Sequence, residues 1–446
     1  MRIRGIAFRL TLLLIFTIPW EQTAELPGRG TITKLVGVGA GVAWFLGVMA
    51  DGRQRRPDRF HAAFFLMVVW IGLTVHWSLD PRSTIKGFLT FVQLLILLLM
   101  LWDLVDTQER VRLALQAYVA GAFVSIGGIL VNFLNDQTTV YLRYSAPGYD
   151  VDGSGLILAL GMPAAIYLAL SGGAEKRSAA LRFLDFAYVP AAIFAIVLTA
   201  TRTAAIASLP TVVFAVLYAA RSRPSLRVAA AAALSCGIYL LVTFAPAASV
   251  DRIALSTKEL SQESSTWGDS FTTGRTGIWQ ESVQAFLKRP LGGVGHGAHR
   301  EAIASGKVAH NTPLSILTET GMIGFALFAT VVACVVGWVR RLTGWEARYW
   351  ITQLAVVMLG AMTLSVEHLK AVWLLVGLAV ASAALAARHE AEPAFHARTL
   401  PLPARTDSFG QTPPAPAPQI SAASVRSPTW QSLPQRGDMD ERRRGN

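Results

Sequence analysis

Charged residues and cysteines are both scarce in this sequence of 446 residues. Only 15% of the residues are Asp, Glu, Lys or Arg, against about 25% in a typical soluble chain, and 53% are hydrophobic. The two cysteines, Cys236 and Cys334, each lie inside a long apolar run, which excludes both a disulfide framework and a thiolate metal cluster. A soluble enzyme is therefore excluded, and we expect a chain that is surrounded largely by lipid.

Apolar stretches long enough to cross a bilayer recur along the chain. About 20 residues of helix are needed to span roughly 30 Å of hydrocarbon. The pattern predicts an all-α polytopic membrane protein over residues 1–388, with about twelve transmembrane helices. The predicted spans are 5–20, 32–50, 60–79, 86–105, 111–133, 154–171, 184–200, 203–220, 227–246, 312–339, 347–366 and 370–388.

Positive charge is divided unevenly between the two sides of these spans. If the N-terminus is cytoplasmic, the N-terminal segment and the connections on that side hold 18 Lys and Arg residues, whereas the short outer connections hold 7. The positive-inside rule then places both termini in the cytoplasm. The net charge of +12 is explained by this sidedness, so no nucleic-acid partner is expected.

Two segments depart from the pattern of spans and short connections. Residues 389–446 are rich in Pro, Ala, Ser and Arg without apolar periodicity, which predicts a disordered cytoplasmic tail. Its arginines either attract anionic lipid or a partner, or are simply solvated. Residues 247–311 form the one long polar connection between predicted spans, on the outer side, and long loops of this kind usually carry function.

The outer loop contains a predicted amphipathic helix. Apolar residues recur at helical spacing over 278–287, Thr273 can cap the start, and Lys288 suits the end. Arg275 then lies at the N-terminus of this helix, where unpaired amides and a guanidinium together favour a phosphate. The alternative is that Arg275 pairs with a carboxylate such as Asp269.

Two other motifs in the outer connections suggest metal or nucleotide binding at first sight. The glycine-rich segment 291–299 follows a helix and lacks dinucleotide spacing, so it predicts a tight turn. His296 and His299 have no third ligand spaced near them. Asp150 and Asp152 have the D-x-D form of many glycosyltransferases, but nucleotide sugars are cytoplasmic, and a polar turn is the better interpretation. We assign no metal site.

Two polar residues lie at predicted span ends. The nearly apolar stretch 187–220 would form a helix of roughly 51 Å, too long for one span, so the chain must turn sharply around Arg202. The guanidinium of Arg202 then lies at the bilayer boundary. It either marks a functional site or extends to the lipid headgroups. His310 opens the next span and can serve as a general base, or it is an interfacial residue bonded to a carbonyl.

Taken in order, these motifs resemble those of the O-antigen ligase and O-antigen polymerase superfamily of bacterial membrane glycosyltransferases. The resemblance covers roughly residues 60–390, and its motifs are Thr201 to Thr203, Gly274 to Trp279, Arg289 to Gly295, His310 with Asn311, and Glu319 to Gly324. It implies a GT-C-type enzyme of the bacterial inner membrane. Such an enzyme takes a glycan from undecaprenyl diphosphate on the periplasmic face and joins it to an acceptor hydroxyl, such as that of lipid A core, without nucleotide sugar, metal or other cofactor.

The resemblance also implies roles for individual residues. By position, Arg202 and Arg275 hold the lipid diphosphate, and His310 activates or orients the acceptor. Because arginine stays charged and binds phosphate in two places, Arg275 can also stabilise the departing pyrophosphate. Arg300, with Lys307 in the same loop, can help to attract a polyanionic donor.

The sequence leaves several functions open. A ligase transfers finished polysaccharide, whereas a polymerase joins lipid-linked repeat units to a growing glycan; the single large outer loop late in the chain favours the ligase. A flippase or other transporter is the alternative of a different class, although internal repeats and midplane ionisable residues are not evident. The expected partners are membrane lipids, and the outer loop can also serve as a docking surface for polysaccharide assembly proteins.

Overall fold

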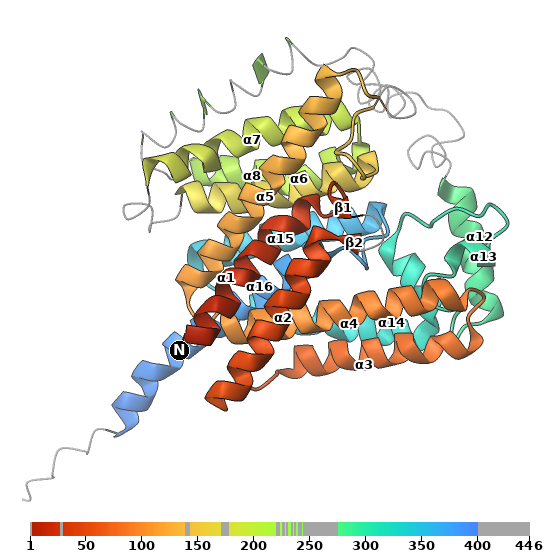
Figure 1. Ribbon diagram of the computed structural model, residues 1–446, viewed down its shortest axis with the longest axis horizontal. Coiled ribbons are helices and arrows are strands. Elements are labelled where there is room, and N and C mark those ends of the chain that lie inside the picture. The colour runs from red at the N-terminus through yellow and green to blue at the C-terminus, as the bar shows by residue number, and fades with distance from the viewer. Residues whose placement is uncertain are drawn as a thin grey trace, which may run out of the picture. The chain divides into compact units, whose positions relative to one another are not determined.

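A computed structural model describes residues 2–26, 30–138, 143–170, 178–219 and 275–399, with isolated positions between 224 and 243. Helices dominate these residues (Figure 1). The described strands are β1 (Glu25–Leu26) and β2 (Gly30–Thr31), which pair antiparallel. The predicted all-α fold is therefore confirmed.

The helices follow the predicted spans closely. Their bounds are α1 (Arg2–Thr17), η1 (Ile18–Trp20), α2 (Ile32–Asp51), α3 (Arg59–Leu73), η2 (Thr74–Trp77), α4 (Pro81–Leu104), α5 (Gln108–Leu134), α6 (Val151–Leu170), α7 (Ala179–Thr199), α8 (Arg202–Ala219), α12 (Arg275–Lys288), α13 (His299–Ala302), α14 (Thr312–Val339), α15 (Gly344–Thr363) and α16 (Lys370–Thr399). In the described part of the chain, nine helices are long and apolar enough to cross a membrane. The protein is thus a multi-pass membrane protein.

The count of twelve spans stays a prediction. Helix α15 and the shorter helix α8 occupy two predicted spans but are not among the nine. The predicted span 227–246 lies, apart from isolated positions, outside the described residues. The same holds for residues 247–274 of the outer loop, which include Thr273 and Asp269.

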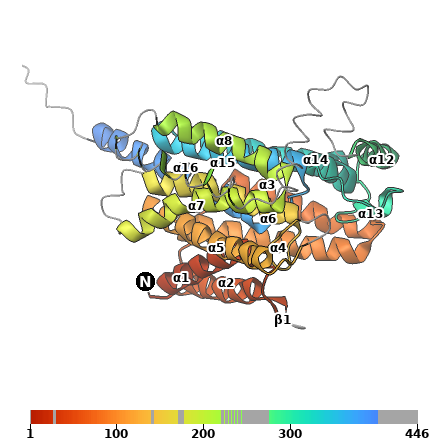
Figure 2. The same ribbon diagram turned by 90° about the horizontal axis from the view of Figure 1, so that it is seen from above.

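Helices α6 and α16 form the centre of the bundle. Most of the apolar window of each is buried, whereas the other candidate spans are less than half buried. Helix α6 packs against α5, α7, α8 and α15, as the two views in Figures 1 and 2 show. A central helix has no polar face, which explains why its apolar residues show no one-sided pattern.

The chain turns sharply between α7 and α8, as predicted. Helix α7 ends at Thr199, Ala200 adopts a left-handed conformation with φ of 47°, and α8 begins at Arg202. The backbone N–H of Ala200 still donates to the carbonyl of Val197, so the helix end is satisfied within the turn. The turn sets Arg202 at the start of a new helix.

The glycine-rich segment packs against a kink in α14. Gly321 has φ of 68° and ψ of −170°, and a side chain there would collide with the carbonyl oxygen of Leu291. The N–H of Met322 donates to Pro290 O at 2.8 Å, and the N–H of Gly295 donates to Glu319 O at 2.9 Å. The segment therefore satisfies backbone groups that the kink releases.

Helix α16 extends further than the sequence pattern suggested. It continues to Thr399, although the predicted tail begins at residue 389. Residues 389–399 are mostly Ala, Glu, Arg and His, and Ala, Glu and Arg favour helix even without an apolar stripe. Residues 400–446 of the predicted tail lie outside the described residues.

Candidate active site

The first turn of α12 lies against the start of α14. The indole N–H of Trp279 donates to Ala309 O at 2.8 Å. Arg275 Nη1 donates to Thr363 O at 2.7 Å, and Asn311 Nδ2 donates to Met362 O at 3.2 Å. The consecutive carbonyls of Met362 and Thr363, at the end of α15, therefore accept hydrogen bonds from Asn311 and Arg275. Asn311 is the residue after His310.

His310 occupies an unusual position in the backbone. It has φ of 48°, and it precedes Asn311, whose side chain caps α14 by accepting from the N–H of Leu314. The imidazole is half-buried. Burial lowers the pKa of His310, Arg275 lowers it further, and Asp152 opposes them. Arg275 and Asp152 are thus close enough to His310 to act on its charge, and the neutral imidazole is favoured at neutral pH.

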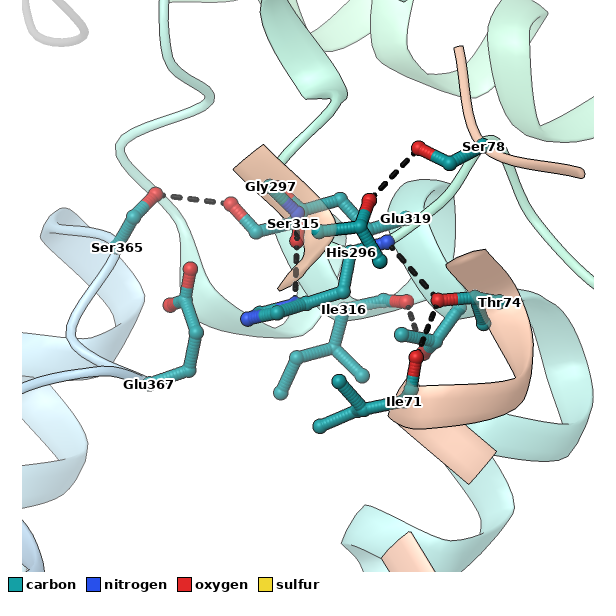
Figure 3. Close-up of polar contacts among 12 residues, drawn as sticks. Ile71, Thr74, Ser78, His296, Gly297, Ser315, Ile316, Glu319, Ser365 and Glu367 are labelled. Carbon is teal, nitrogen blue, oxygen red and sulfur yellow. Dashed lines mark hydrogen bonds and ion pairs between the residues drawn. The ribbon is translucent and has the colours of Figure 1, made fainter. Parts of the chain in front are cut away.

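The α15–α16 loop, residues 364–369, joins the start of α14 from the other side. Thr312 Oγ1 donates to Leu364 O at 2.9 Å and accepts from the N–H of Val366 at 2.8 Å. The Ser315 and Ser365 hydroxyls are 2.8 Å apart (Figure 3). Together these bonds fix the direction in which α14 leaves the loop, and so the position of His310.

Asp152 connects the α7–α8 turn to the same site. It lies in the first turn of α6, forms an ion pair with Arg143 Nη2 at 3.2 Å, and accepts a hydrogen bond from the Thr201 hydroxyl. Arg143 Nε also donates to Thr199 O at 2.8 Å. Thr201 is the residue before Arg202, so these contacts fix the backbone from which Arg202 begins α8.

The predicted role of Asp152 as a polar turn residue is wrong. Asp150 does act locally, since it accepts from the N–H of Gly153 at 2.6 Å just before α6. Asp152 instead lies inside the helix and makes long-range contacts, because the α7–α8 turn packs onto the first turn of α6. Burial lowers the pKa of Arg275, and the charge of Asp152 offsets part of this lowering.

The other predicted binding residue, Arg300, lies on the short helix α13. Its side chain is exposed, and its charge contributes to the lowered pKa of His310 after burial and Arg275. Arg300 therefore belongs to the outer rim of the site, whereas Arg202 and Arg275 are half-buried. Lys307 is exposed, and its backbone carbonyl lies 3.1 Å from His299 Nδ1.

His296 and His299 are both used in internal contacts. The ring of His299 is 2.9 Å from the Ser282 hydroxyl, which joins α13 to α12. His296 Nδ1 lies 2.8 Å from Glu319 Oε2 in a buried ion pair, at an angle outside that of a good hydrogen bond. Burial lowers the pKa of His296, but Glu319 and Glu367 together outweigh burial and the pKa is raised. Figure 3 shows His296 beside Glu319. These histidines hold the glycine-rich segment in place.

Four residues of this region were not predicted as site residues: Arg143, Asp152, Glu367 and His368. Burial and the Glu319 carboxylate raise the pKa of Glu367 to about 7. His368 follows Glu367 in the same loop, and its side chain is exposed. One signal was available, because an adjacent Glu and His stand between two apolar helices on the predicted outer side.

The fold and the site define a multi-pass membrane protein in which arginines, carboxylates and a histidine act on one another near the ends of α12, α14 and α15. Residues 187–329 match the model of the protein family described as O-antigen ligase, which confirms the resemblance. The matched stretch includes the predicted site residues Arg202, Arg275, Arg300 and His310, and it leaves out Arg143 and Asp152. No curated protein matches the chain.

Proposed function

We propose that the protein transfers a glycan from undecaprenyl diphosphate to an acceptor hydroxyl, with lipid A core as the acceptor. The observation that carries the proposal is that Arg275 and Asn311, the neighbour of His310, donate to consecutive carbonyls at the end of α15, and that the charge of Arg275 acts on His310. The match to the O-antigen ligase family supports the reaction class. The positive-inside count supports an inner-membrane site that opens to the periplasm, with both termini cytoplasmic.

The reaction exchanges one carbon–oxygen bond for another. The acceptor oxygen bonds to the anomeric carbon of the donor while the bond from that carbon to the diphosphate oxygen breaks. Undecaprenyl diphosphate leaves with the electron pair. His310 takes the hydroxyl proton as the new bond forms, which its lowered pKa permits because the neutral imidazole can accept a proton at neutral pH.

The arginines stabilise the negative charge that grows on the leaving diphosphate. Arg275 and Arg202 are half-buried, where a charge interacts more strongly than in open water, and Arg300 attracts the donor from the rim. Guanidinium groups bind phosphate oxygens in pairs and stay protonated, so they can supply the charge stabilisation of this step. Asp152 orients Arg143 and Thr201 at the edge of this cluster.

The test is transfer by purified protein in liposomes that contain a lipid-linked glycan and lipid A core. Arg275→Ala is expected to abolish transfer at normal protein abundance. Arg340→Ala, which removes an exposed arginine at the other end of α14, is the matched control and should retain activity. Equal loss in both variants, or transfer that survives Arg275→Ala, would contradict the proposal.

Mass analysis of the lipid-linked glycans in a deletion strain separates the ligase from the polymerase. Long chains that remain on undecaprenyl diphosphate indicate a ligase, which is the result we expect. Accumulation of single repeat units would indicate a polymerase. An unchanged pool would contradict both enzymes and favour a transporter or scaffold.

A further inference from the structure

An open groove of about 570 Å³ lies at the end of α12 opposite Arg275. Its walls are Trp70 and Trp77 from α3 and η2, Leu291 and the two glycines that follow it, and Ile323 from α14, with Arg289 at one side. This volume lies within the range of small-molecule sites in proteins. None of these side chains has a role in the site described above.

The groove is preformed and presents apolar faces. The indole N–H of Trp70 donates to Thr320 O at 2.9 Å, and that of Trp77 donates to Gly292 O at 3.1 Å, so both polar atoms point into the protein. The two rings lie 5.6 Å apart. Leu291 is 67% exposed and Ile323 is 40% exposed. A groove of this kind suits a hydrocarbon chain.

Arg289 adds a positive charge to this apolar groove. Its Nη1 donates to Trp77 O at 2.9 Å, which holds the exposed guanidinium at the edge of the aromatic pair. A guanidinium carries five N–H donors, so this one bond still allows it to bind a phosphate. Apolar walls beside one cation match a lipid whose phosphate stands next to its hydrocarbon chains.

The groove also lies at the depth expected for a lipid headgroup. Trp77 ends a candidate span, and tryptophan gathers at the boundary between hydrocarbon and water. The kink of α14 at Gly321 is directly beside it, and the apolar remainder of α14 continues from there. Figure 1 shows α12 and α13 beside the ends of α3, α4 and α14.

The distance between the groove and the active site decides which lipid it fits. Helix α12 has 14 residues, so Arg275 and Arg289 are separated by roughly 20 Å along its axis. In the proposed reaction the donor phosphate is bonded directly to the reacting carbon, so it must lie at Arg275. A lipid phosphate at Arg289 therefore belongs to a molecule whose reacting sugar is several sugars away from its phosphate.

We propose that the groove of Trp70, Trp77, Arg289 and Leu291 anchors the acceptor, a phosphorylated glycolipid whose oligosaccharide reaches along α12 to His310. This inference rests on the proposed glycan transfer and adds a binding site for the second substrate. It assigns the two ends of α12 to different substrates, with the donor diphosphate at Arg275 and the acceptor phosphate at Arg289.

The test compares two acceptors with the full-length protein in liposomes that contain a fixed lipid-linked donor. The acceptors are lipid A that carries its core oligosaccharide and the same oligosaccharide freed from lipid. In wild type we expect a lower KM for the lipid-anchored acceptor. Leu291→Glu and Arg289→Gln should each raise this KM roughly tenfold, so that the advantage over the freed acceptor disappears. Arg289→Lys, which keeps the positive charge, should retain part of the advantage of the lipid-anchored acceptor.

Leu287→Glu is the matched control, because Leu287 is 66% exposed on α12 but does not line the groove. It should keep the wild-type ratio of the two KM values. An unchanged ratio in Leu291→Glu and Arg289→Gln would overturn the inference while leaving the proposed function intact. A raised KM for the donor in these variants would assign the groove to the donor lipid and overturn it as well. Absence of transfer by the wild type would instead contradict the proposed function.

Discussion

The outer loop contains two histidine regions that differ in how their charges are paired. His296 is enclosed and faces Glu319 at 2.8 Å, and the N–H of Gly297 donates to the same carboxylate at 2.8 Å. His310 is half-buried at the mouth of α14, and Arg275 is among the charges that act on it. The first region pairs its charges within the protein. In the second, burial, Arg275 and Arg300 lower the pKa of His310, and Asp152 and Asp150 oppose them.

This difference separates a structural site from a site for a ligand. Burying opposite charges together fixes the position of a segment, since neither partner can leave without exposing the other unpaired. A half-buried histidine at the mouth of a helix is instead placed to meet a ligand, because its neutral imidazole can accept a proton. We therefore assign stability to the His296 region and the proposed glycan transfer to the His310 region.

The largest expected effect on activity is that of His310→Ala. Loss of a general base typically reduces the rate by about 10²- to 10⁴-fold. Because His310 is only half-buried, the melting temperature should change little. Transfer rates in liposomes and thermal melting of the purified variant measure both quantities. A destabilised His310→Ala protein would remove the distinction between the two regions.

Glu319→Ala should lower the stability of the protein rather than act on catalysis directly. It leaves the buried His296 without its partner, and breaking a buried ion pair costs about 3–5 kcal/mol. We expect low abundance in the membrane and a lower melting temperature. Glu319→Gln is the control that keeps an acceptor for the N–H of Gly297 and should be less damaging. Normal melting of Glu319→Ala with loss of activity alone would place Glu319 in catalysis.

Gly321→Ala should have a smaller effect, and on stability. The glycine has φ of 68°, and a methyl group there would lie 2.2 Å from Leu291 O. Residues forced into such conformations cost roughly 1–3 kcal/mol. Gly337→Ala in the same helix is the control, since nothing lies within 4 Å of the position that its methyl group would take. Equal melting temperatures for the two variants would show that the kink tolerates a side chain at residue 321, against the account.

The smallest expected effect is a shift in the pH dependence of transfer. His310 must be neutral to accept a proton, so activity should fall as the pH drops through its pKa, which lies below the ordinary 6.5. Asp152 raises this pKa, so Asp152→Asn should move the acidic limb to lower pH. Measurement of kcat against pH for both proteins tests this sign, and a shift to higher pH would contradict it.

Much of the fold can be predicted from local sequence patterns, whereas the candidate site can be predicted from them only in part. Long apolar runs and the short helix after Thr273 are local features, as is the turn at Arg202, because too many apolar residues precede and follow it for one span. The contact of Asp152 with Thr201 joins residues 49 positions apart, and no periodicity encodes it. The pairing of His296 with Glu319 depends likewise on the kink at Gly321.

The most direct test measures the products of one reaction in two proteins. Wild type and His310→Ala are placed in liposomes with a lipid-linked glycan and lipid A core, and free undecaprenyl diphosphate and glycosylated acceptor are quantified together. We predict one released undecaprenyl diphosphate for each glycan transferred by wild type, and neither product above background for a normally folded His310→Ala. Equal transfer by both proteins would contradict the assignment of catalysis to the His310 region.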